Sequence, residues 1–237
     1  MPAIEVENLS HSYNNKHALK EISVKIQEGD FIGLIGPNGS GKTTLIKNIL
    51  GFLEPDNGDI QIFGKEVENF NDWDRIGYIP QRFKEDKQFP GTVRELLEAD
   101  SAVTGSDSDV SSLNLEQFIG SKFTELSGGQ KQRAMLALAL QKDPDIIILD
   151  EPSLGVDADT QENFYNLVED LNETGKTVIL VTHDISVVSK YTDKVICINN
   201  TVCCQGSTEN LEDQVEEVYG EKLRSSTTWV RTDAGDA

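Results

Sequence analysis

Gly36-Pro37-Asn38-Gly39-Ser40-Gly41-Lys42-Thr43 matches the phosphate-binding loop G-x-x-x-x-G-K-[ST] over its whole length, and this stretch decides the fold. The apolar run Phe31–Ile35 leads into it, which is typical of a strand buried on both faces. A helix is expected to follow from about Lys42 to Leu50. Glycines let backbone N–H groups curl around phosphates, and the helix N-terminus adds positive potential. The stretch therefore predicts a nucleoside triphosphate site between a buried strand and a helix.

Two side chains of this loop carry specific expectations. Lys42 is expected to reach the β- and γ-phosphates, and the Thr43 hydroxyl to ligate Mg²⁺. A second apolar strand, Ile146–Leu149, ends at Asp150, which should lie beside the loop, where such an Asp holds Mg²⁺. The expected ligands are therefore a nucleoside triphosphate and Mg²⁺. The residues expected to bind the triphosphate, which the family resemblance given below implies to be ATP, are Gly36, Pro37, Asn38, Gly39, Ser40, Gly41, Lys42, Thr43 and Thr44.

The order of the elements predicts an α/β protein. Strands alternate with helices, which indicates a P-loop NTPase core with a mainly parallel sheet. Ahead of it, apolar and polar residues alternate at Ile4 and Val6 and again from Ile22 to Ile26, as in an antiparallel sheet with one wet face. Residues 82–126 have few strand signals, so we expect an inserted helical subdomain there. The whole chain, 1–237, is expected to form one domain that ends in a helix and a polar tail over 207–237.

The remaining elements follow from local patterns. A turn is expected at Asp56-Asn57-Gly58, and a loop from Thr104 to Ser112. Further strands are expected at Ile60–Phe63, Arg75–Ile79, Val178–Val181, Val195–Ile198 and Thr201–Cys204. Further helices are expected at Thr92–Glu98, Ala134–Leu140 and Gln161–Thr174.

A second motif narrows the class of protein. Leu126-Ser127-Gly128-Gly129-Gln130 precedes a helix, Ser127 is a good N-cap, and the glycines open backbone N–H groups to an anion. With the phosphate-binding loop and Asp150-Glu151, the arrangement resembles the nucleotide-binding subunit of an ATP-binding cassette (ABC) transporter, from about residue 3 to residue 206. The resemblance implies an ATP hydrolase coupled to transport. It also implies that the signature residues cap the γ-phosphate held by another subunit, in an ATP-dependent head-to-tail homodimer; these residues are Ser127, Gly128, Gly129 and Gln130.

The same resemblance gives roles to single residues. Glu151 is the implied general base, Gln81 contacts Mg²⁺ and water, and His183 hydrogen-bonds the γ-phosphate and orients the water. Tyr13 is the implied aromatic that stacks on adenine. Asp157 ends a Leu-Gly-Val-Asp stretch that matches the loop through which each subunit senses the other's site.

The net charge of −20 argues against nucleic acid as a partner. Phosphate neutralisation needs clustered Lys and Arg, whereas this chain has 41 acidic and only 21 basic residues. The apolar strands exclude a disordered acidic protein. The charge is interpreted as a solvated acidic coat of the kind found in proteins of very salty cytoplasm, with an ordinary acidic bacterial protein as the alternative.

The sequence has no apolar run of the ~18 residues that a membrane helix needs. Its N-terminus lacks the pattern of a secretory signal. We therefore expect a peripheral protein at the cytoplasmic face of the membrane, taken there by another subunit. The three cysteines are expected to be reduced thiols, with Cys197 and Cys203 as small buried hydrophobic residues.

Two classes of function share these motifs. The first is a transport ATPase that powers separate membrane permease subunits and, indirectly, an extracellular substrate-binding protein. The second is a soluble ABC ATPase acting in assembly; a chromosome-maintenance protein is disfavoured because only a short stretch separates the two motifs. Four stretches resemble the zinc- and manganese-type uptake branch: Ile76–Phe83, Phe89–Val93, Leu154–Asp157 and Thr182–Ile185. The tail over 207–237 contains no histidine, unlike the His-rich tails of many relatives in that branch. An importer for another solute stays an alternative.

Overall fold

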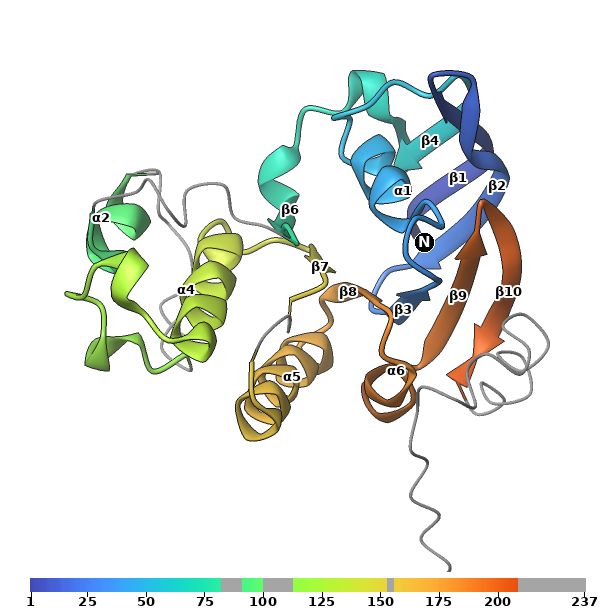
Figure 1. Ribbon diagram of the computed structural model, residues 1–237. Helices are drawn as coiled ribbons and strands as arrows, with labels where there is room; N and C mark the ends of the chain where they lie inside the picture. Colours follow the sequence, from blue (N-terminus) through green and yellow to red (C-terminus); the bar gives the residue numbers. More distant parts are fainter. Residues whose placement is uncertain (82–90, 100–112, 153–155, 209–237) are drawn as a thin grey trace, which may run out of the picture.

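The computed structural model describes residues 1–81, 91–99, 113–152 and 156–208, and these residues form two sheets with helices around them (Figure 1). The first sheet is antiparallel and has the order β2-β1-β4-β5. Its strands are β1 (Pro2–Tyr13), β2 (Lys16–Gln27), β4 (Asn57–Ile62) and β5 (Lys65–Glu66). The N-terminal antiparallel sheet that the sequence predicts is thus confirmed.

The second sheet has the order β10-β9-β3-β8-β7-β6 and is parallel except for the edge strand β10. Its strands are β3 (Phe31–Ile35), β6 (Ile76–Ile79), β7 (Ile146–Asp150), β8 (Thr177–Thr182), β9 (Lys194–Asn199) and β10 (Thr201–Ser207). All five residues of β3 and of β7 are buried, as the apolar runs predict. The α/β class with a mainly parallel sheet is therefore confirmed.

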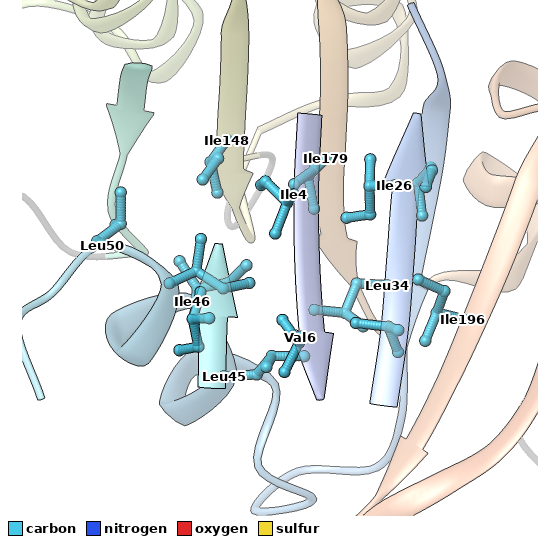
Figure 2. Close-up of a cluster of buried hydrophobic side chains, with 14 of the residues drawn as sticks. Ile4, Val6, Ile26, Leu34, Leu45, Ile46, Leu50, Ile148, Ile179 and Ile196 are labelled. Carbon is cyan, nitrogen blue, oxygen red and sulfur yellow. The ribbon is translucent and has the colours of Figure 1, made fainter. Parts of the chain in front are cut away.

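Alternation along the buried strands divides the core between the two faces of the parallel sheet. Ile146 and Ile148 of β7 join one hydrophobic cluster, whereas Ile147 and Leu149 join another. The antiparallel sheet and α1 (Lys42–Ile49) pack on the first face, where Ile4, Val6, Leu45 and Ile46 meet Leu34, Ile148 and Ile179 (Figure 2). The second cluster draws on α4 (Gly128–Leu140), α5 (Ala158–Glu173) and α6 (Ile185–Tyr191).

The helical insert is described only in part. Helix α2 (Val93–Glu98) begins at Thr92, whose side chain forms a capping box with Glu95, and this confirms the helix expected there. The loop expected from Thr104 to Ser112 and the tail from 209 onwards lie outside the described residues. The single-domain assignment over 1–237 stays a prediction. Short 3-10 helices complete the described part: Val67–Asn69, Trp73–Arg75, Leu115–Gln117 and Phe123–Glu125.

Two local predictions are wrong. Asn57 and Gly58 belong to β4 rather than to a turn, because Gly58, at φ 94°, lets the strand pass close to the backbone of Asn8 at an irregularity in the β1–β4 pairing. Phe63 has a left-handed backbone (φ 49°) and follows the strand instead of belonging to it. Helix α6 was not expected at all.

The cysteine prediction is also wrong in two respects. Cys197 is buried as expected, but it forms a disulfide with Cys204 across the β9–β10 hairpin, with the two Cα atoms 4.9 Å apart. Cys203 is exposed and free rather than buried. A register shift between Val202 and Cys204 explains the choice of partner, since it turns Cys204 rather than Cys203 toward Cys197.

No helix in the described part of the chain is both long and apolar enough to cross a bilayer.

Candidate nucleotide-binding site

The phosphate-binding loop is held between two backbone walls. A β-carbon on Gly36 would lie 2.1 Å from the carbonyl oxygen of Ile198, at the end of β9. A β-carbon on Gly41 would lie 2.5 Å from the carbonyl oxygen of Ala18 in β2, and Gly41 also has a φ of 105°. Only glycine fits such contacts, because real Cβ atoms do not approach other atoms so closely. The two glycines therefore place the loop between the two sheets, where α1 begins at Lys42.

A cavity of about 410 Å³ opens over this loop. It brings together most of the residues that the sequence assigns to ATP: Tyr13, Gln81 and Glu151 line it with the loop, although they come from distant parts of the chain. Tyr13 is 45% exposed, and its ring lies edge-on against that of His11, with the ring centres 4.8 Å apart. An exposed aromatic face beside a phosphate-binding loop suits a nucleotide base. The full lining is Tyr13, Lys16, His17, Ala18, Asn38, Gly39, Ser40, Gly41, Lys42, Thr43, Thr44, Gln81, Glu151 and Asn200.

Lys42 is buried and poised in the loop. Its Nζ donates hydrogen bonds to the carbonyl oxygens of Gly36 (2.7 Å) and Pro37 (3.2 Å). Burial lowers the pKa of Lys42, while the nearby carboxylates of Glu151 and Asp150 raise it. A triphosphate would bring further negative charge to this ammonium group and so favour its charged form.

Asp150 is 1% exposed at the end of β7. Its Oδ1 accepts a hydrogen bond from Thr43 Oγ1 at 3.4 Å, and its Oδ2 has no hydrogen-bond partner within the described residues. Burial raises the pKa of Asp150, and the Thr43 hydrogen bond opposes that rise. Mg²⁺ prefers oxygen ligands such as a hydroxyl and a carboxylate oxygen that has no hydrogen-bond partner. Thr43 and Asp150 therefore fit the ion.

Glu151 follows Asp150 but turns away from it. Its backbone is left-handed, with φ 52°, and its N–H donates to the carbonyl oxygen of Val181 at 2.9 Å. This conformation directs its carboxylate to Nδ1 of His183, at 2.8 and 3.0 Å from the two oxygens. His183 follows β8, and its side chain is 56% exposed. A non-glycine residue in this conformation is strained, and such strain is concentrated at functional sites.

The signature residues lie at the start of α4. Ser127 Oγ accepts from the N–H of Gln130 at 3.3 Å, and Gln130 Oε1 accepts from the N–H of Ser127 at 2.9 Å, a capping box. The N-cap predicted at Ser127 is thus confirmed. Within the described part of the chain, the cavity over the phosphate-binding loop is not lined by any signature residue. Gly128 is exposed and leaves the start of the first turn open, as an anion site needs, whereas Gly129 is buried.

Asp157 is the N-cap of α5, and its Oδ1 accepts from the N–H of Thr160 at 3.0 Å. Thr160 in turn touches the signature helix, since a β-carbon on Gly129 would lie 2.1 Å from its methyl group. The Asp157 loop and the signature helix are therefore packed together within one chain. Leu154 and Gly155 of this loop lie outside the described residues.

Four residues of the cavity lining were missed in the sequence: Lys16, His17, Ala18 and Asn200. Lys16, His17 and Ala18 begin β2, and Asn200 forms the turn between β9 and β10. None of them belongs to a local motif. Their proximity to the loop depends on the packing of the two sheets, for which the sequence has no short-range signal.

The phosphate-binding loop lies at full length between β3 and α1, with a buried Asp at the end of β7 and a strained Glu beside it. This arrangement defines a P-loop nucleoside triphosphatase. The antiparallel sheet and the capped Ser-Gly-Gly-Gln helix narrow the class further. The chain belongs to the ABC transporter family, whose model matches residues 19–154. It is an ATP-binding protein of that family, an ATP hydrolase coupled to transport.

Curated relatives match almost the whole chain. The zinc uptake system ATP-binding protein ZurA of Listeria innocua is 37% identical over 98% of this chain and 97% of its own length. The manganese transport system ATP-binding protein MntB of Bacillus subtilis is 36% identical over 93% of each chain.

Solved structures share the fold. The ADP conformation of MJ1267, an ATP-binding cassette of an ABC transporter, has a TM-score of 0.81 and 28% identity over 92% of this chain and 98% of its own. A dimeric post-hydrolysis state of the cassette MJ0796, bound to ADP and Pi, has a TM-score of 0.74 and 29% identity over 86% of this chain and 98% of its own. The mixed α/β fold of an ABC cassette is thereby confirmed.

Proposed function

We propose that this ABC ATPase powers the import of a divalent metal ion, zinc or manganese, through separate membrane permease subunits. The observation that carries the proposal is the 37% identity over 98% of the chain to a zinc uptake ATPase, with a manganese transport ATPase nearly as similar. The protein would work at the cytoplasmic face of the membrane, and an extracellular substrate-binding protein would deliver the metal to the permease.

ATP would occupy the cavity over the phosphate-binding loop. Tyr13 would stack on the adenine, the loop from Gly36 to Thr44 would hold the phosphates, and Lys42 would neutralise their charge. Bound Mg²⁺, held by Thr43, Asp150 and Gln81, would neutralise charge that develops on the phosphates. Support comes from the unpaired Oδ2 of Asp150 and from Gln81 in the same cavity lining.

Glu151 would accept the proton of the attacking water, and His183 would orient Glu151 and contact the γ-phosphate. Their contact at 2.8 Å supports this pairing. A pair of ABC chains would arrange head to tail, so that Ser127, Gly128, Gly129 and Gln130 of one chain meet the ATP held by the other. Within the described residues no signature residue lines the cavity over the loop of its own chain, which supports the shared site. The Asp157 loop would connect the two sites.

Removal of the gene tests the cargo. In metal-poor medium, cell zinc or manganese should fall several-fold, and the wild-type gene should restore it, whereas a Glu151→Gln gene should not. Mass spectrometry of cell metal content provides the measurement. Normal zinc and manganese, with loss of an organic solute instead, would refute the metal assignment and leave the ATPase intact.

Replacement of the base tests the chemistry. Glu151→Gln keeps the shape of the side chain but removes its basicity, so ATP should still bind while hydrolysis falls roughly 10²–10⁴-fold. Phosphate release by the purified chain measures this. Glu169→Gln neutralises an exposed carboxylate on α5 and is the matched control, expected to hydrolyse ATP normally. A wild-type rate for Glu151→Gln would remove the base assignment.

A further inference from the structure

Asn200 connects three parts of the structure through four hydrogen bonds. Its N–H donates to the carbonyl oxygen of Ser40 at 2.8 Å, and its own carbonyl oxygen accepts from the N–H of Lys20 at 2.7 Å. Its side-chain Nδ2 donates to the carbonyl oxygens of His17 (3.2 Å) and Ala18 (2.9 Å). One turn residue thus joins the β9–β10 hairpin, the phosphate-binding loop and β2.

The backbone of Asn200 has the conformation that this turn requires. Its φ is 62°, in the left-handed region that asparagine tolerates better than most residues other than glycine. The turn therefore favours Asn, Asp or Gly for its shape. The amide group is a separate requirement, because only a side chain with N–H donors reaches the two carbonyl groups of β2.

The bonds of Asn200 act on the two walls that hold the loop. Gly36 lies against the carbonyl group of Ile198 on the hairpin side, and Gly41 lies against that of Ala18 on the β2 side. Neither wall is bonded to the other by regular strand pairing, since β2 and β9 belong to different sheets. The Asn200 amide spans them, with Ala18 as the acceptor on the far wall.

The bond to Ser40 fixes a peptide group of the loop itself. In a trans peptide the C=O and the following N–H point in opposite directions. When the Ser40 carbonyl is held by Asn200, the N–H of Gly41 is held pointing away from Asn200. Backbone N–H groups of such loops are the donors that cradle phosphates, so their direction determines how well the loop is prepared for ATP.

We propose that Asn200 is a positioning residue of the ATP site, which pre-organises the Ser40–Gly41 peptide by tying the β9–β10 hairpin to β2. The inference rests on the proposed ATP site. The hydrogen bonds of Asn200 go to backbone groups of the protein, so we expect its removal to weaken ATP binding and to leave the chemical step intact.

Two substitutions separate the backbone role from the amide. Asn200→Gly keeps the left-handed turn and the backbone bonds to Ser40 and Lys20, and it removes only the amide. Asn200→Asp replaces the donor with a carboxylate that faces two carbonyl oxygens. Asn199→Asp is the matched control: it places the same charge on the adjacent exposed position, whose backbone pairs with Thr201 in the hairpin.

The dissociation constant for a fluorescent ATP analogue and the KM and kcat for ATP are measured on the full chain. Asn200→Asp should raise the dissociation constant and KM roughly tenfold or more, and Asn200→Gly several-fold. Asn199→Asp should stay within about twofold of wild type, and kcat should change less than threefold throughout. Melting temperatures confirm that each variant is folded at the assay temperature.

Equal ATP affinity for Asn200→Asp, Asn200→Gly and Asn199→Asp would overturn the inference. A fall in kcat with unchanged KM would do so too, because that pattern belongs to a residue of the chemical step. Lys42→Ala is the reference for the site as a whole. If it binds the analogue as tightly as wild type, the proposed ATP site itself is wrong; if it loses binding while the Asn200 variants keep it, only the role of Asn200 fails.

Discussion

Asp150 and Glu151 are neighbours in sequence but lie in different surroundings. Asp150 is enclosed at the end of β7, where burial opposes its charge and raises its pKa. Glu151 contacts the largely exposed His183 through a strained backbone. The different surroundings of these adjacent carboxylates match different proposed roles: Asp150 as a metal ligand and Glu151 as the acceptor of the proton from water.

The burial of Asp150 predicts a conflict between stability and function. Asp150→Asn removes a charge that is enclosed without Mg²⁺, so the ATP-free variant should melt about 2–4 °C higher, equivalent to roughly 1 kcal/mol. Its ATPase activity should fall sharply, because an amide binds Mg²⁺ more weakly than a carboxylate. Calorimetry without nucleotide and an ATPase assay measure the two effects. A less stable variant would contradict the expectation.

The difference in stability between Asp150→Asn and the wild type should depend on pH. The pKa of Asp150 is raised in the folded chain above its ordinary value of 3.8, so the protonated form favours folding. The stabilising contribution is complete below about pH 3.8 and is lost as the pH rises through the folded pKa. The advantage of Asp150→Asn should therefore be full at neutral pH and vanish in acid, which melting curves over a pH series can show.

At the scale of elements, α4 packs on β6 through Gly77. A β-carbon there would lie 2.5 Å from the carbonyl oxygen of Ala139, which is backbone and cannot rotate away. Gly77→Ala should force the helix off the strand and cost about 1–3 kcal/mol, or several degrees in melting temperature. Gly120→Ala is the control, because among the described residues no atom beyond its chain neighbours lies within 4 Å of the added carbon. Equal melting temperatures for the two variants would show that α4 adjusts freely.

The sequence predicts elements well where their signals are local. The buried strands β3 and β7 follow from unbroken apolar runs, and the loop with Asp150 follows from a motif with its flanking strand. Helix α6 was missed because it is short and rich in β-branched residues with low helix propensity, so packing rather than periodicity forms it. Gly58 was misread since glycine serves turns and strand irregularities alike.

The site divides in the same way. Lys42, Thr43 and Asp150 lie in motifs that the sequence shows directly. Asn200 reaches the phosphate-binding loop only because β9 lies beside β3 in the folded sheet, and no sequence motif indicates this order of strands. The pairing of Cys197 with Cys204 depends on one register shift in a hairpin, which no spacing rule indicates. Strand order and exact strand register are therefore what the sequence alone could not supply.

At the scale of the whole molecule, a shared ATP site predicts complementation. Lys42→Ala impairs the loop of one chain, and Ser127→Arg blocks the signature of the other. Each variant alone should be inactive, but a mixture should recover part of the ATPase activity, because a mixed dimer retains one intact site. As a control, Lys42→Ala alone at the same total protein concentration should recover no ATPase activity. No recovery, with mixed dimers shown by sedimentation, would count against the head-to-tail arrangement.

The acidic surface predicts a dependence on salt. At a net charge of −20, self-repulsion is screened over ~3 Å in 1 M salt but over ~10 Å in 0.1 M salt. If the coat is an adaptation to high salt, the melting temperature should climb steeply with potassium chloride. The same temperature in dilute buffer and in molar salt would favour an ordinary acidic protein.

The central place of β3 has a consequence for how the chain folds as it is synthesised. Its two sheet neighbours are β8 and β9, and Phe31 pairs with Val178 from the far end of the described chain. The antiparallel sheet and α1 are complete after residue 66 and have local partners. The partners of β3 are synthesised much later, so β3 stays unpaired for most of translation. Until then the unpaired backbone edges and apolar faces of β3 are open to wrong partners, as is usual when long-range strands pair late. A ribosome stalled before β8 would therefore hold a chain that carries its phosphate-binding loop and its antiparallel sheet, but in which β3 lacks both of its neighbours in the parallel sheet.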